Sequence, residues 1–191
     1  GISSLEVNTT GASNTAVGGQ ALKANTTASN NTAVGSSALG ANTTGTAGTA
    51  VGKGALQTNT TGTDNTGLGA LALSATTTGS NNVAVGRSAL QTNTTGHSNT
   101  ASGVNALLLN TTGTQNTALG MGSLTFNQTA SHNTAVGFNS LNANTTGTQN
   151  VAVGASALDA NTTASYNTAI GEKSLSTNIL GSKSTAVGTF A

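Results

Sequence analysis

The sequence of 191 residues contains no cysteine, proline or tryptophan, and only 5% of its residues are charged and 2% aromatic. Without cysteine, disulfides and thiolate metal sites are excluded. With five basic residues and a net charge of +1, the chain has no basic patch for a phosphate backbone, so we exclude nucleic acid as a partner. No apolar run approaches the roughly 20 residues that cross a bilayer, so we expect no membrane insertion by this segment.

The chain does contain one 17-residue unit, which recurs eleven times without insertion or deletion. The unit reads Asn-Thr-Ala-Val-Gly at positions 1 to 5, Ala-Leu at positions 8 and 9, and Asn-Thr-Thr-Gly at positions 12 to 15, and these position numbers are kept below. Low charge and many small polar residues are also typical of disorder. A disordered tract has no reason to keep such a register, whereas a solenoid has, because each coil stacks on the next.

The residue types favour a β-solenoid. Helical repeats need about 33–47 residues, whereas β-branched residues beside Gly and Asn at a short fixed period indicate short stacked strands. We predict an all-β fold, a parallel β-solenoid of 17-residue coils that forms a single domain over residues 1–191. One strand is expected on positions 1–4, and a second over positions 8–14. Between them we expect a turn at a glycine of positive φ. These glycines are Gly18, Gly35, Gly52, Gly69, Gly86, Gly103, Gly120, Gly137, Gly154, Gly171 and Gly188.

Two positions carry the large aliphatic residues. Position 9 is always leucine and position 4 is Val, Leu or Ile except at Ser102, so both are predicted to form the core. Positions 3 and 8 hold only small residues, which indicates that something packs closely against them. The predicted core residues are Val17, Leu22, Val34, Leu39, Val51, Leu56, Leu68, Leu73, Val85, Leu90, Leu107, Leu119, Leu124, Val136, Leu141, Val153, Leu158, Ile170 and Leu175.

The polar residues fall into two groups. Every charged residue lies at position 6, 7, 10 or 17, so these positions are predicted to face water. The uncharged Asn and Thr columns are expected to bond along the stack as ladders. The Asn-Thr-Thr strings also have the form of glycosylation sequons, but a ladder explains their regularity. The predicted ladder at position 12 consists of Asn8, Asn25, Asn42, Asn59, Asn93, Asn110, Asn127, Asn144 and Asn161.

Catalysis needs groups that converge, and the repeat keeps them apart. His97 and His132 lie two coils apart at variable positions, as surface residues rather than metal ligands. Asp64 is too many coils from either histidine for a triad. Asp159 and Glu172 are one coil apart but at different positions, which does not suit paired-carboxylate chemistry. We therefore expect no enzyme, no metal site and no cofactor.

The strings around the glycine carry a resemblance. Asn14 to Gly18, Asn133 to Gly137, Asn150 to Gly154 and Asn167 to Gly171 resemble the head repeats of trimeric autotransporter adhesins, the YadA-like family. The longer unit with Ala-Leu and Asn-Thr-Thr-Gly also resembles fibre proteins of bacterial viruses and of environmental bacteria. The resemblance covers the whole chain. It implies a left-handed parallel β-roll, three chains to a fibre, an extracellular place on a bacterial cell or virion, and attachment as the task.

The core predicted for one coil is thin, which favours a second buried face and hence identical chains as partners. Both ends of the stack would be open sheet edges, so we expect this chain to be a segment of a longer fibre. The function hypothesis is an adhesive or structural extracellular fibre, such as a cell-surface adhesin or a tail fibre, whose surface receptor the repeats do not name. The alternative is ice binding by exposed threonine columns.

Overall fold

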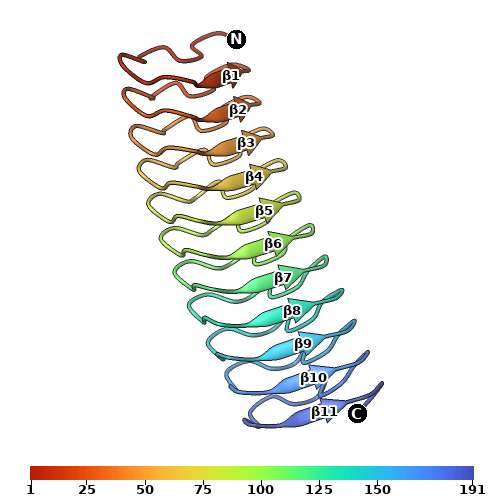
Figure 1. The fold of residues 1–191 in the computed structure, drawn as a ribbon. Coiled ribbons are helices and arrows are strands. Elements are labelled where there is room, and N and C mark those ends of the chain that lie inside the picture. The colour runs from red at the N-terminus through yellow and green to blue at the C-terminus, as the bar shows by residue number, and fades with distance from the viewer.

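The structure, a computed structural model, describes all 191 residues and is a β-solenoid with one short strand in each coil (Figure 1). All eleven strands are parallel and form one sheet in the order of the sequence, with no helix. The chain ends lie at opposite ends of the stack. The strands are β1 (Thr15–Val17), β2 (Thr32–Val34), β3 (Thr49–Val51), β4 (Thr66–Leu68), β5 (Val83–Val85), β6 (Thr100–Ser102), β7 (Thr117–Leu119), β8 (Thr134–Val136), β9 (Val151–Val153), β10 (Thr168–Ile170) and β11 (Thr185–Val187).

The register of the sheet repeats the register of the sequence. Each strand residue pairs with the residue 17 positions later, as Ala33 does with Ala50 and Ala50 with Gly67. Every strand contacts only the strands before and after it. The parallel β-solenoid of 17-residue coils predicted from the period is therefore the observed fold.

The second predicted strand, over positions 8–14, is not present. In this segment a stacking bond alternates with a bond inside a turn: Leu39 N donates to Ala55 O at 3.0 Å in the next coil, whereas Asn42 N donates back to Leu39 O at 3.1 Å. The leucine has a φ of 49°, in the left-handed region, so the backbone bends at each leucine instead of extending.

The hydrophobic core consists of leucine and alanine, and buried serines replace the position-8 alanine at Ser123, Ser140 and Ser174. Positions 3, 8 and 9 point into each coil and form one cluster of 24 buried residues that runs through the stack. Nine of the predicted leucines, from Leu22 to Leu158, have no exposed surface, and Leu175 packs against the cluster partly buried. The small residues at positions 3 and 8 thus pack in the same cluster as the leucines.

The prediction that position 4 belongs to the core is wrong. Along a strand successive side chains point to opposite faces, so when the alanine at position 3 points inward its neighbour at position 4 points outward. Val51, for example, exposes 40% of its surface while Ala50 exposes none. The residues concerned are Val17, Val34, Val51, Leu68, Val85, Leu119, Val136, Val153 and Ile170.

The left-handed backbone also explains why position 9 is always leucine. Its φ lies between 49° and 54° in every coil, where a β-branched residue is strongly disfavoured. Leucine branches one carbon further out, so it can fill the core from this backbone. No valine or isoleucine of the chain has a positive φ.

The position-5 glycines have the positive φ predicted for them, between 124° and 139°. At this point successive coils come so close that a side chain has no room. A Cβ added to Gly103 would lie 2.5 Å from the carbonyl oxygen of Gly120 in the next coil. The glycine is therefore required by both the backbone angle and the stacking distance.

The asparagines at position 12 form the predicted ladder, buried inside the stack. The Nδ2 of Asn42 donates to Oδ1 of Asn25 at 3.0 Å, and the Nδ2 of Asn59 donates to Oδ1 of Asn42 at 2.9 Å. Each amide also donates to the carbonyl at position 15 of its own coil, as Asn42 does to Gly45 at 2.9 Å. The threonines at position 13 add a parallel column in which Oγ1 donates to a carbonyl of the next coil.

A single threonine interrupts this ladder. Thr76 occupies the position between Asn59 and Asn93, and neither the Oδ1 of Asn59 nor the buried Oγ1 of Thr76 has a hydrogen-bond partner. A buried polar atom without a partner costs about 1–3 kcal/mol. The ladder therefore consists of two segments, Asn8 to Asn59 and Asn93 to Asn161, with a weak point between them.

Replacing Thr76 by asparagine is expected to stabilise the protein by about 2 kcal/mol, because it joins the two segments and satisfies the orphaned oxygen of Asn59. For a chain of this size the melting temperature should rise by about 4–8 °C in a calorimetric scan. Thr78→Asn makes the same chemical change at an exposed position and should shift the melting temperature little. An unchanged melting temperature in Thr76→Asn would contradict the role given to the ladder.

Candidate functional site: the outer face of the sheet

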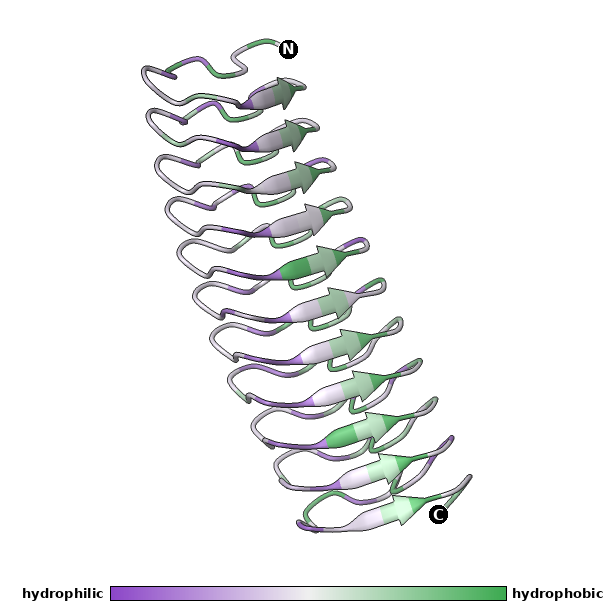
Figure 2. Ribbon diagram, in the orientation of Figure 1, coloured by the Kyte–Doolittle hydropathy of each residue, from purple (hydrophilic) through white to green (hydrophobic).

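The outer face of the sheet is built by positions 2 and 4 of every strand. Alternation turns both away from the alanine core, so each strand presents one residue from each position to solvent. Figure 2 shows the result along the rod: the hydrophobic ends of most strands lie one above another, beside a paler column at the strand starts.

The position-4 column is an aliphatic stripe of partly or fully exposed side chains along the whole stack, interrupted only by Ser102. In the middle of the rod, Val85 and Leu119 expose 38% and 37% of their surfaces. Scattered apolar residues are ordinary on a protein surface, whereas a continuous apolar line is typical of a contact surface. We name this column the aliphatic stripe.

The position-2 column beside it holds nine threonines, with Val83 and Val151 as the exceptions. These side chains are partly or fully exposed, and pairing of the strands keeps them in register. The neighbouring threonine column at position 13 differs, because its hydroxyls are held by bonds along the stack, as between Thr43 and Thr60 O at 3.0 Å. A further threonine column, at position 14, is exposed on the segment before each strand.

The charged side chains lie away from this face. All of them are exposed except Asp159, which is half-buried, and the one ion pair joins the Nζ of Lys23 to Glu6 at 3.7 Å. His97 and His132 are exposed, and no group of three or more His, Asp or Glu residues is close enough to hold a metal ion. The acids Asp64, Asp159 and Glu172 likewise form no cluster.

Sequence reasoning missed this face because it assigned position 4 to the core by hydropathy. Variation within the repeats carries the missed signal. Position 4 accepts Val, Leu, Ile and, at Ser102, a polar residue, whereas position 3 accepts only Ala or Gly and position 9 only Leu. A packed interior tolerates less variation than a surface, so the invariant positions mark the core.

The fold and this face define a structural repeat protein, a β-solenoid whose coils present the same side chains at the same places along the rod. Comparisons with models of protein families, with curated proteins and with solved structures gave no match. No helix long and apolar enough to span a membrane occurs in the structure.

Proposed function

We propose that this chain is a rod-forming segment of an extracellular attachment fibre, in which identical chains associate through the outer face of the sheet. The aliphatic stripe is the observation that carries the proposal. It leaves about ten aliphatic side chains partly exposed to water, and removing such a surface from water drives association.

The repeat of the stripe favours a second copy of the chain as the partner. An exposed side chain recurs with every coil, at the strand spacing of about 4.8 Å. Only a partner with the same axial repeat can contact every coil along the rod, and another copy of this chain has that repeat. The resemblance to the head repeats of trimeric adhesins supports three chains and a place on a bacterial cell or virion surface, where the fibre would hold a receptor-binding tip outward.

A double substitution within the stripe tests the association. Leu119→Lys with Val136→Lys places two ammonium groups on the face and should weaken self-association at least about a hundredfold, because each would be buried without a partner. Analytical ultracentrifugation of the wild type should show an oligomer, and the variant should sediment as a monomer with unchanged circular dichroism.

The matched control is Ala70→Lys with Ala155→Lys, which adds the same charges at position 6, where Lys53 occurs naturally and is exposed. This variant should remain oligomeric. A wild-type protein that sediments as a monomer over the whole accessible concentration range would rule out the proposed association.

Ice binding is the second candidate, and the position-2 threonines on the same face favour it. Nine threonines beside an aliphatic column on one parallel sheet form a regular array that could order water. This use needs the face uncovered, so it requires a monomer. Thermal hysteresis in the wild type, abolished by Thr117→Lys, would support it. Identical freezing and melting points for the wild type at millimolar concentration would exclude it.

A further inference from the structure

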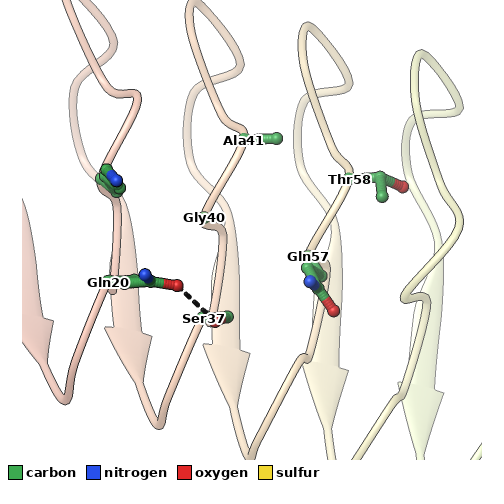
Figure 3. A pocket seen from close by; sticks show the side chains of 7 residues that line it. Gln20, Ser37, Gly40, Ala41, Gln57 and Thr58 are labelled. Carbon is green, nitrogen blue, oxygen red and sulfur yellow. Dashed lines mark hydrogen bonds between the residues drawn. The ribbon is translucent and has the colours of Figure 1, made fainter.

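An open groove of about 190 Å³ lies on the segments that follow strands β1, β2 and β3, away from the sheet face (Figure 3). Its walls come from positions 7, 10 and 11 of successive coils, and no strand residue contributes. Gly40 and Ala41 form part of the lining, and the polar side chains around them are Gln20, Lys23, Ser37, Gln57 and Thr58.

The groove exists because one coil lacks a side chain. Position 10 holds a side chain in every coil except at Gly40, with Lys23 in the coil before and Gln57 in the coil after. The backbone does not require glycine here, since Gly40 is not among the glycines of positive φ. An added Cβ would lie 3.2 Å from Ser37 O, a tight contact, but every other coil carries a side chain at this position. Neither turn geometry nor stacking therefore explains this glycine.

The lining combines carboxamides, hydroxyls and one cation. The hydroxyl of Ser37 donates to Oε1 of Gln20 at 3.3 Å, and Gln57 projects from the next coil beyond Gly40 (Figure 3). Thr58 donates its hydroxyl hydrogen to Ser74 O at 2.8 Å, which leaves the hydroxyl oxygen as an acceptor. The two carboxamides add both donors and acceptors at the sides of the groove.

Lys23 supplies the positive charge. Its Nζ lies 3.7 Å from Glu6, and both side chains are 47% exposed, so the pair is weak and leaves the ammonium able to bind another anion. The repeat does not fix these side chains, because each occupies a variable position, although the Thr58 hydroxyl also bonds to the next coil.

We propose that this groove binds a single uronic acid unit of a polysaccharide. Neighbouring hydroxyls of a sugar ring match the paired donors and acceptors of Gln20 and Gln57, and the carboxylate of the sugar matches Lys23. The volume of about 190 Å³ lies below the 300–1,000 Å³ typical of pockets for drug-sized ligands, which suits one ring. Because the groove is open, the affinity for one unit is about millimolar.

The proposal does not rest on the fibre function. The groove lies outside the aliphatic stripe, so its occupation and the association of chains are measured independently. Saturation-transfer NMR with sodium glucuronate at millimolar concentration reports binding, and ultracentrifugation of the same samples reports association. Glucose is the matched uncharged probe.

Gly40→Gln is the decisive variant, because it fills the groove with the residue that position 10 already carries at Gln57 and Gln91. It should fold normally and lose glucuronate binding by about tenfold or more. Ser74→Gln makes the same addition at position 10 two coils further on and should bind like the wild type. Lys23→Gln should weaken the binding of glucuronate by about threefold and leave the binding of glucose unchanged.

Equal saturation transfer in the wild type and Gly40→Gln would overturn the groove as the site. Absence of transfer from glucuronate to the wild type would overturn sugar binding altogether. Equal binding of glucose and glucuronate, insensitive to Lys23→Gln, would overturn the assignment of the charged sugar.

Discussion

Replacing Gly103 by alanine is expected to destabilise the protein by at least about 3 kcal/mol. Its φ of 139° is strained for any residue with a side chain, and the added Cβ would lie 2.5 Å from the carbonyl oxygen of Gly120. The stack would have to open between these two coils. A lower melting temperature and a new proteolytic cleavage near residue 103 are the expected observations.

Gly40→Ala is the control for this substitution. Gly40 has no positive φ, and its added Cβ would make a tight contact of 3.2 Å with Ser37 O, against the 2.5 Å clash at Gly103. The same Gly-to-Ala change should therefore alter the free energy of unfolding by no more than about 1 kcal/mol. If Gly103→Ala and Gly40→Ala had the same melting temperature, the close approach of coils at position 5 would be refuted.

The second large effect separates the true core from the aliphatic stripe. Leu107→Ala should lower the free energy of unfolding by about 3 kcal/mol, because Leu107 is fully buried and truncation leaves a cavity in the leucine and alanine cluster. Leu119→Ala removes the same atoms from a residue that is 37% exposed and should cost about 1 kcal/mol or less in the dissociated chain.

Urea unfolding at low protein concentration measures both costs. Raising the concentration should then increase the difference between the wild type and Leu119→Ala, since Leu119 contributes to association in the proposed fibre. The difference in unfolding free energy between the wild type and Leu107→Ala should depend much less on protein concentration. Equal destabilisation by the two variants in the dissociated chain would contradict the placement of Leu107 inside the coil and of Leu119 outside it.

The parts of the fold that follow from a fixed spacing could be predicted from the sequence. The 17-residue period predicted parallel stacking, and the Asn that recurs at position 12 in every coil but that of Thr76 predicted the amide ladder between residues such as Asn25 and Asn42. Glycine at position 5 marked a positive φ because glycine is the residue that adopts it freely. In each case one residue type has one dominant physical reason to recur.

The orientation of the strand could not be read from hydropathy. In Thr-Ala-Val the larger Val34 looks like the core residue, yet the coil is so narrow that only Ala33 fits inside. At Gly67, which replaces this alanine in one coil, an added Cβ would already lie 3.2 Å from Ala72 O and 3.5 Å from the Cγ of Leu56. The space inside the coil, a tertiary property, decides which face is buried.

The left-handed backbone conformation of the leucines could not be predicted from the sequence for a different reason. Leucine is a good helix former and ordinary in strands, so nothing local indicates a φ near 50° at Leu39 or Leu56. The conformation costs about 1–2 kcal/mol for an L-residue, which burial of the side chain in the core offsets. The outer face was missed as a consequence. Position 4 was predicted to lie in the core, whereas the core is formed by position 3 and the leucine.

The constant pairing of each residue with the one 17 places later has a genetic consequence. Each coil contacts only its neighbours, so any in-frame loss or gain of one repeat rejoins equivalent atoms and leaves every face intact. Unequal recombination within such a gene therefore changes the length of the rod in steps of about 4.8 Å without creating a misfolded product. Natural variation in repeat number would change the length of the rod, whereas a single-residue insertion would disrupt the pairing between coils.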